Sequence, residues 1–504
     1  MTPTNPTPTS RVARLSTGVA ELDSILDGGF PENRIYLIQG EPGTGKTTLA
    51  LQFLMEGGRQ GEPGLYVTLS ETKEELLSIA ASHGWSLDTF EIYELVTPED
   101  SLKPESQYTI FHPSEVELSE TTTAVLEQVD RVKPRRVVFD SLSEMRLLAR
   151  DPLRFRRQIR SLKQYFAGHE STVLLLDDKV DQGQDLQVQT VAHGVLSLEH
   201  LAVEYGMERR RMRVIKLRGS RFRGGYHDFQ IRTGGLAVFP RLVASEHHQK
   251  FDRTSVSTGL KALDTLLGGG LDRGTSTLIM GPAGSGKSTL ASHFAAAAAK
   301  RGEKAALFIF DELKETLLSR SEGTGASLGK YVDEGKVTIQ QIDPAELSPG
   351  EFVQYVRRCV DEMDARVIVI DSLNGYINAM PEERFLTIQM HELLTYLNQQ
   401  GVVTVMVMAQ HGFLGNTMAT PVDVSYLADS VLLLRYFEAE GAIRRALSVV
   451  KKRSGAHEST IREVQFTPQG IHVGEPLRNF RGVLTGVPLF DGPVESANNN
   501  NESK

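Results

Sequence analysis

The sequence contains the stretch Gly40-Glu41-Pro42-Gly43-Thr44-Gly45-Lys46-Thr47 and, much later, the similar stretch Gly281-Pro282-Ala283-Gly284-Ser285-Gly286-Lys287-Ser288. Both fit the pattern G-x-x-x-x-G-K-[S/T] of a phosphate-binding loop. Glycines let such a loop curl so that its N–H groups point at phosphate oxygens, and the following helix directs its positive end toward the same anion. An apolar run precedes each loop, at residues 35–38 and 277–280, and a helix-favouring run follows it. The order strand, loop, helix therefore supports both copies of the motif.

The same pattern assigns roles to individual residues. The loop lysine reaches the β- and γ-phosphates of a nucleotide, and the hydroxyl of the next residue ligates Mg²⁺. Downstream of each loop an apolar run ends in Asp-Ser, at residues 136–141 and 367–372, which would place a carboxylate at the carboxyl edge of the sheet beside Mg²⁺. The predicted nucleotide-binding residues are Gly43, Thr44, Gly45, Lys46, Thr47, Thr48, Gly284, Ser285, Gly286, Lys287, Ser288 and Thr289. The predicted magnesium ligands are Thr47, Asp140, Ser288 and Asp371.

The two loops belong to a duplicated domain. Ser16-Thr17-Gly18 recurs as Ser257-Thr258-Gly259, at the same separation as the two loops. Strands and helices alternate within each copy, which predicts an α/β fold with a mostly parallel, twisted sheet and helices on both faces. We expect a disordered N-terminus, two domains and a disordered Asn-rich tail, at residues 1–11, 12–247, 248–490 and 491–504.

Composition excludes several classes of protein. The 504-residue chain carries a net charge of −9, which makes nucleic-acid binding unlikely as a general property. A single cysteine, Cys359, excludes an intrachain disulfide framework and a cysteine-based zinc site. No apolar run is long enough to span a membrane, and the Thr/Pro-rich N-terminus lacks the apolar core of a secretory signal. We therefore expect a cytoplasmic protein without a membrane segment.

Acidic residues follow the first strand after each loop helix. The pairs are Ser70-Glu71 and Asp311-Glu312, and we expect them to end a strand beside the loop strand, close to a γ-phosphate. A carboxylate at that place can orient and deprotonate an attacking water or hydroxyl, which assigns catalytic roles to Glu71, Asp311 and Glu312. Capping of the next helix by Ser70 and its neighbours explains the first pair equally well.

A basic strand lies late in each copy. Lys216 and Arg218, like Lys451 and Arg453, are two positions apart and so share one face of a strand. These cations could contact a γ-phosphate across a subunit boundary, as arginine fingers do. Two alternatives stay open: a plain solvated face, and a nucleic-acid patch formed with nearby arginines. Those arginines are Arg209, Arg210, Arg211, Arg221 and Arg223.

Over residues 12–490 the chain resembles the KaiC family of circadian-clock ATPases and autokinases, which consist of two fused RecA-like P-loop domains. The resemblance rests on the paired Ser-Thr-Gly motifs, both loops and both Asp-Ser strand ends. It also rests on Lys216-Leu217-Arg218-Gly219, on the run at residues 429–436 and on Ala456-His457-Glu458. These motifs are spread over both copies.

The resemblance implies a homohexamer of two stacked rings, with ATP and Mg²⁺ between subunits, and Kai-type or other signalling proteins as partners. It implies ATP hydrolysis in both rings and, in the second ring, phosphate transfer to an adjacent Ser-Thr pair. In the family the first of two adjacent glutamates is the general base. Cations of the basic strand contact the neighbour's nucleotide, a role that falls here on Lys216, Arg218, Lys451 and Arg453.

Three positions depart from the family pattern. Ser70 replaces the first glutamate of the first ring, so either Glu71 substitutes for it or first-ring hydrolysis is weak. Asp311 replaces the corresponding glutamate of the second ring with a shorter base. The acceptor pair aligns with Ser425-Tyr426, which makes Ser425 the predicted phosphoacceptor and argues against two-site phosphorylation. Two other functions stay open: a RecA/RadA-like DNA-binding motor, and an ATP-binding signalling scaffold with little hydrolysis.

Overall fold

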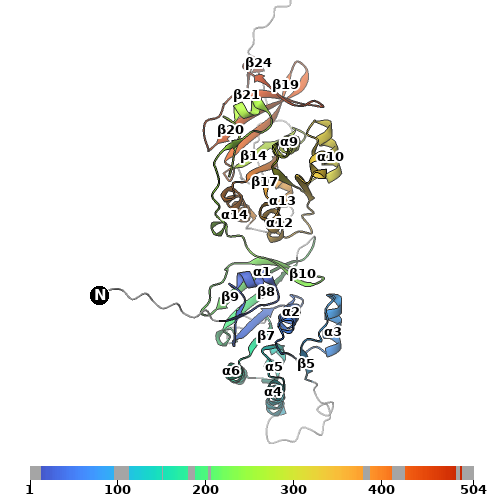
Figure 1. Cartoon of the computed structure of the whole chain (residues 1–504), viewed down its shortest axis with the longest axis vertical. Helices are drawn as coiled ribbons and strands as arrows, with labels where there is room; N and C mark the ends of the chain where they lie inside the picture. Colours follow the sequence, from blue (N-terminus) through green and yellow to red (C-terminus); the bar gives the residue numbers. More distant parts are fainter. Residues whose placement is uncertain are drawn as a thin grey trace, which may run out of the picture. The chain divides into compact units, whose positions relative to one another are not determined.

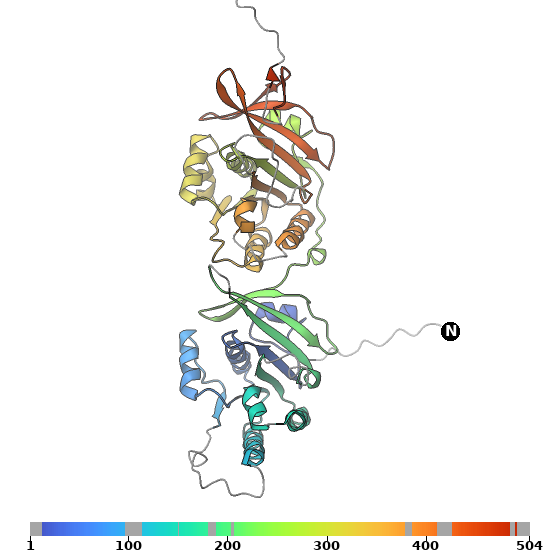
Figure 2. The same ribbon diagram turned by 180° about the vertical axis from the view of Figure 1, so that it is seen from behind.

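The computed structural model describes residues 13–95, 113–149, 151–179, 188–202, 206–378, 386–410, 426–483 and 489–490. The chain divides into two compact units, Met1–Arg241 and Leu242–Lys504, each built around a nine-stranded sheet with helices beside it (Figures 1 and 2). The two termini predicted to be disordered, residues 1–11 and 491–504, lie outside the described residues. Among the described helices, none combines the length and the apolar character that a membrane span requires.

The sheet of the first unit has the strand order β11-β10-β9-β8-β3-β7-β6-β4-β5. The strands from β8 to β5 in this order run parallel, whereas β9, β10 and β11 are antiparallel. The strands are β1 (Arg14–Leu15), β2 (Phe30–Pro31), β3 (Ile35–Gly40), β4 (Gly64–Thr68), β5 (Glu91–Glu94), β6 (Arg136–Asp140), β7 (Thr172–Asp178), β8 (Gly194–Leu201), β9 (Arg209–Leu217), β10 (His227–Arg232) and β11 (Gly235–Phe239). The helices are α1 (Ala20–Ile25), α2 (Lys46–Arg59), α3 (Lys73–Ser82), α4 (Pro113–Val132), α5 (Leu142–Ala149) and α6 (Pro152–Gly168).

The second unit repeats this plan with the strand order β16-β15-β17-β18-β14-β19-β20-β21-β22, in which the strands from β16 to β19 are parallel. The strands are β12 (Ser255–Val256), β13 (Leu271–Asp272), β14 (Ser276–Gly281), β15 (Lys304–Ile309), β16 (Val337–Gln341), β17 (Ala365–Asp371), β18 (Val403–Ala409), β19 (Ser430–Ala439), β20 (Ala442–Lys452), β21 (Ile461–Thr467), β22 (Gly470–Pro476), β23 (Phe480–Arg481) and β24 (Leu489–Phe490). The helices are η3 (Ala244–Glu246), α8 (Lys261–Leu266), α9 (Lys287–Lys300), α10 (Lys314–Gly323), α11 (Leu328–Asp333), α12 (Pro349–Asp361), α13 (Leu373–Asn378) and α14 (Leu386–Gln399).

Helices cover both faces of each sheet. In the first unit Ile38 of β3 packs in the same core as α2, whereas its neighbour Leu37 packs in the core that contains α4, α5 and α6 (Figure 1). In the second unit Ile279 of β14 packs with α9, and Leu278 packs with α12 and α14. Burial on both faces explains why the loop strands are apolar without alternation. The predicted α/β class, with two tandem P-loop domains and mostly parallel sheets, is confirmed.

One prediction about strand order is wrong. The strands that precede the acidic pairs, β4 and β15, do not lie beside the loop strands β3 and β14. β7 and β6 lie between β3 and β4, and β18 and β17 lie between β14 and β15. In each unit the strand that follows the loop helix lies away from the loop strand, and two later strands of the chain lie between them. The order of strands along the chain therefore does not give their neighbours in the sheet.

Candidate functional site

Both phosphate-binding loops have a backbone that only glycine adopts without strain. Gly43 and Gly45 have φ angles of 79° and 91°, in the left-handed region. Gly286, the counterpart of Gly45, has a φ of 102°, and a Cβ atom added there would lie 2.2 Å from Cζ of Phe466. The loops are therefore curled and pressed against the antiparallel part of the sheet, as a phosphate cradle requires.

The helices that leave the loops have uncapped N-termini. Thr72, Asp151 and Ser348 cap α3, α6 and α12 with side-chain oxygens. α2 and α9, each of 14 residues, begin after glycine, and no side chain of the described residues caps them. Their first N–H groups are thus left for an anion, and the helix dipole favours a negative charge there. Both loops fit the phosphates of a nucleotide.

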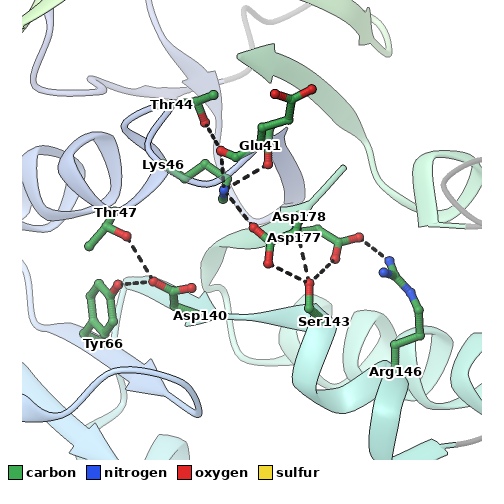
Figure 3. Close-up of polar contacts among 11 residues, drawn as sticks. Glu41, Thr44, Lys46, Thr47, Tyr66, Asp140, Ser143, Arg146, Asp177 and Asp178 are labelled. Carbon is green, nitrogen blue, oxygen red and sulfur yellow. Dashed lines mark hydrogen bonds and ion pairs between the residues drawn. The ribbon is translucent and has the colours of Figure 1, made fainter. Parts of the chain in front are cut away.

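The first loop brings together a lysine, a hydroxyl and a carboxylate (Figure 3). Lys46 Nζ donates to the carbonyls of Gly40 and Glu41, at 2.9 and 3.0 Å. Thr47 Oγ1 donates a long hydrogen bond of 3.4 Å to Asp140 Oδ2. Oxygen atoms placed in this way can both bind one cation. Burial raises the pKa of Asp140, which a bound cation would offset. Thr47 and Asp140, the two residues predicted to bind magnesium in this unit, therefore lie side by side.

A tyrosine that the sequence analysis did not single out holds the same carboxylate. Tyr66 is fully buried on β4, and its hydroxyl donates to Asp140 Oδ2 at 2.6 Å (Figure 3). A buried tyrosine needs a partner for its hydroxyl, so its place in a buried strand was a usable signal. The second unit has Leu307 at the equivalent position. The two sites therefore orient their aspartates differently.

Glu71 lies near Asp140 and has an unsatisfied oxygen. Its buried Oε2 atom has no hydrogen-bond partner among the described residues. Burial raises its pKa, the charge of Asp140 adds to the rise, and the charge of Lys46 opposes it. The next helix does begin here, as the capping alternative expects, but its cap is Thr72, in a capping box with Glu75, and not Ser70. A half-buried carboxylate with a raised pKa is suited to accept a proton.

The second loop holds a similar lysine and aspartate. Lys287 Nζ donates to the carbonyl of Pro282 at 2.8 Å. Burial lowers the pKa of Lys287 to about 8, although the charge of Asp371 acts in the opposite direction. Burial raises the pKa of Asp371 to about 6, and a hydrogen bond from Ser288 opposes the rise. The predicted ligands Ser288 and Asp371 are in contact, as in the first unit.

Both carboxylates of the acidic pair in the second unit have hydrogen-bond partners. Asp311 Oδ2 accepts a hydrogen bond of 2.5 Å from the hydroxyl of Ser372. Glu312 accepts two hydrogen bonds from the guanidinium of Arg320, at 2.6 and 2.7 Å. The first unit has Ile79 in place of Arg320, which leaves Glu71 without a cation of this kind. Arg320 lies two turns into the helix that follows the acidic pair. Its position in the sequence could have indicated that it pairs with Glu312.

The arginine that follows each basic strand lies at the end of the sheet opposite to the loop. The N–H of Arg218 donates to the carbonyl of His193, whose own N–H donates to the carbonyl of Ile35 at the start of β3. The loop begins at Gly40, at the other end of β3, roughly 16 Å away at the usual rise of a strand. In the second unit the N–H of Arg453 donates to the carbonyl of Asp429. The N–H of Asp429 in turn donates to the carbonyl of Ser276, at the start of β14. The two arginines are therefore anchored at the end of the sheet that is away from the loop of their own unit.

The four cations make one kind of contact. Each donates to a backbone carbonyl of the segment that leads into the adjacent strand, β8 or β19. The acceptors are Gln189 for Lys216, Thr190 for Arg218 at 2.8 Å, Ala428 for Lys451 at 2.7 Å, and Tyr426 for Arg453 at 2.7 Å. The predicted phosphoacceptor Ser425 lies outside the described residues, and its neighbour Tyr426 is exposed.

Comparisons with known proteins agree with this geometry. A family model described as "ATPase: KaiC" matches residues 15–243 and again residues 256–478. The chain is 26% identical over 502 residues to a circadian clock protein, KaiC3, of Synechocystis sp., and the match covers 97% of both chains. It is 28% identical to a circadian clock oscillator protein, KaiC, of Parasynechococcus marenigrum, with 95% of this chain and 93% of the relative covered. The KaiC protein of Synechococcus elongatus is 26% identical, with 96% and 94% covered.

Proposed function

Because the chain belongs to the KaiC family of ATPases, we propose that it hydrolyses Mg²⁺-ATP at both loops and autophosphorylates in its second unit. The observation that carries the proposal is the duplicated set of lysine, hydroxyl and buried aspartate: Lys46, Thr47 and Asp140, and Lys287, Ser288 and Asp371. Bound ATP would supply the transferable phosphoryl group, and Mg²⁺ would neutralise its charge. The cytoplasm is the proposed compartment.

The chain's own residues have separate roles in this proposal. The loop glycines and helix N-termini bind the phosphates, and the lysines contact the β- and γ-phosphates. Glu71 accepts the proton of the attacking water in the first unit, because it is half-buried and has a free oxygen. In the second unit Asp311 is the proposed base, and Glu312, which Arg320 holds by two hydrogen bonds, assists it.

The position of one arginine in each unit supports a ring assembly. Arg218 is anchored at the end of the sheet away from its own loop, so it would contact a nucleotide that another copy presents. Arg453 repeats this arrangement in the second unit, and Lys216 and Lys451 share a strand face with these arginines. A contact between two different surfaces of identical chains closes into a ring when the rotation permits. We propose the homohexamer of the family, with Kai-type or other signalling proteins as partners.

The DNA-motor alternative is less well supported. Two arginines of the proposed patch are neutralised within the unit, since Arg210 pairs with Glu208 and Arg211 with Glu199, both at 2.9 Å. An intramolecular carboxylate competes with a phosphate for each of these cations. Binding to single-stranded DNA that falls steeply with salt would revive this alternative.

A labelled-phosphate experiment tests the proposal. The protein is incubated with γ-labelled ATP and Mg²⁺, and free phosphate is separated from protein-bound label. We expect both products, and we expect Ser425→Ala to abolish the bound label while Tyr426→Phe, the matched control, retains it. Free phosphate alone would refute the autokinase. Neither product, with ATP still bound, would favour the scaffold.

A further inference from the structure

The lysine of the first loop already has an anionic partner. Lys46 Nζ lies 2.9 Å from Asp178 Oδ1, at the end of β7 (Figure 3). An ammonium group has three donors, and the other two are directed at the carbonyls of Gly40 and Glu41. The carboxylate of Asp178 therefore takes the donor that is not bound to the loop itself.

The surrounding side chains hold Asp178 in this position. The hydroxyl of Ser143, on α5, lies 3.2 Å from Asp178 Oδ2, and the N–H of Asp178 donates to the same hydroxyl at 3.3 Å. The adjacent Asp177 is neutralised by Arg146, 2.5 Å away (Figure 3). Asp177 is thereby occupied, and Asp178 is left as the carboxylate that faces the loop lysine.

The second unit lacks this arrangement. Gly40 pairs with Asp178 in the register between β3 and β7, whereas Gly281 pairs with Ala409 in the register between β14 and β18. Alanine thus stands where the first unit has an acid. No carboxylate forms an ion pair with Lys287 in the part of the chain that the structure describes.

We propose that Asp178 is a built-in competitor of the nucleotide at the first loop and makes that loop bind ATP more weakly than the second. The proposal rests on the proposed ATP binding. An incoming phosphate must displace the carboxylate from Lys46, and the displaced charge then repels the phosphate at short range. Ala409 imposes neither cost on the second loop. The nucleotide-free first loop, in contrast, is stabilised by the ion pair.

Affinity measurements on single-loop proteins test this role. The full chain with Lys287→Ala reports the first loop, and the full chain with Lys46→Ala reports the second. Each is titrated with a fluorescent ATP analogue in the presence of a chelator, so that no hydrolysis occurs. In the first-loop protein, Asp178→Asn is expected to tighten binding about 5- to 30-fold, the range for a partly exposed, charge-assisted contact. Asp178→Glu, which keeps the charge, is expected to stay within about threefold of the parent.

Three outcomes distinguish the proposed competition by Asp178 from the proposed binding of ATP. Tighter binding in Asp178→Asn but not in Asp178→Glu supports the competitor. Unchanged or weaker binding in Asp178→Asn overturns it, even when the second-loop protein binds the analogue and the proposed function stands. Absence of binding in both single-loop proteins overturns the proposed function and the competitor together. We also expect nucleotide-free Asp178→Asn to unfold at a lower temperature, because it lacks the ion pair with Lys46. A structural change elsewhere would not lower the unfolding temperature and tighten binding together.

Discussion

The buried aspartate of the second loop predicts how metal binding depends on pH. Asp371 has a pKa raised to about 6 by burial, so its carboxylate is about one-tenth ionised near pH 5 and almost fully ionised near pH 7.5. An aspartate with an ordinary pKa would be about nine-tenths ionised at the lower pH. Mg²⁺ binds the ionised form. Affinity for Mg²⁺ should therefore fall about tenfold between these two pH values through Asp371 alone.

Titration calorimetry measures this effect. The protein carries Lys46→Ala to silence the first loop, is saturated with ADP, and is titrated with Mg²⁺ near both pH values. Asp371→Asn is the matched control, because its remaining pH dependence belongs to the nucleotide and to other groups. We expect the parent to lose about tenfold more affinity than the control on acidification. Equal pH dependence in both proteins would show that Asp371 either does not bind the metal or is ionised throughout.

Three further predictions concern the carboxylates and the basic residues of the sites. Glu71→Gln should slow phosphate release from the first loop about a hundredfold or more, whereas Glu75→Gln, which breaks the capping box, should leave it within about threefold in the same single-turnover assay. The raised pKa of Asp371 gives stability that is full below pH 3.8 and is lost as pH rises through about 6. Asp371→Asn should therefore stabilise the nucleotide-free protein at neutral pH by at most about 3 kcal/mol, seen as a higher calorimetric midpoint, and leave it unchanged near pH 4. A chain with Lys216→Ala and Arg218→Ala should hydrolyse ATP at its first loops at least about tenfold more slowly, and mixing it with a loop-inactivated chain should restore part of the rate if the cations act between subunits.

Much of the fold could be predicted because its signals are local. A phosphate-binding loop is a short stretch with fixed glycines, and Gly43 and Gly45 adopt the φ angles that the motif implies. Apolar runs before the loops gave the buried strands for the same reason. The place of β4 was predicted wrongly, because strand order in a sheet depends on crossovers that no local pattern encodes.

The partners of the site residues were harder to predict, because they come from distant parts of the chain. Tyr66 and Asp140 meet only because β4 and β6 are adjacent in the sheet. Asp178 reaches Lys46 only because β7 pairs with β3 in one register, and a shift by one residue would turn its side chain to the other face. The sequence shows that Asp178 ends an apolar run, but it does not show that Asp178 pairs with Lys46.

The two units keep the same loop and differ in the charges around it. In the first unit the acid Asp178 neutralises the loop lysine, while Glu71 keeps an oxygen without a partner. In the second unit no acid pairs with Lys287 among the described residues, while Arg320 neutralises Glu312. Competition at the lysine weakens binding of the phosphates, whereas an arginine on the carboxylate lowers its tendency to take a proton. Under the two proposals, the first unit differs by weaker nucleotide binding, and the second differs by the ion pair on Glu312, which assists the proposed base Asp311. Exchanging the residues at these two places, with Asp178→Ala and Ile79→Arg in the first unit, should make its affinity and its rate approach those of the second, and single-loop affinity and turnover assays would measure the two effects separately.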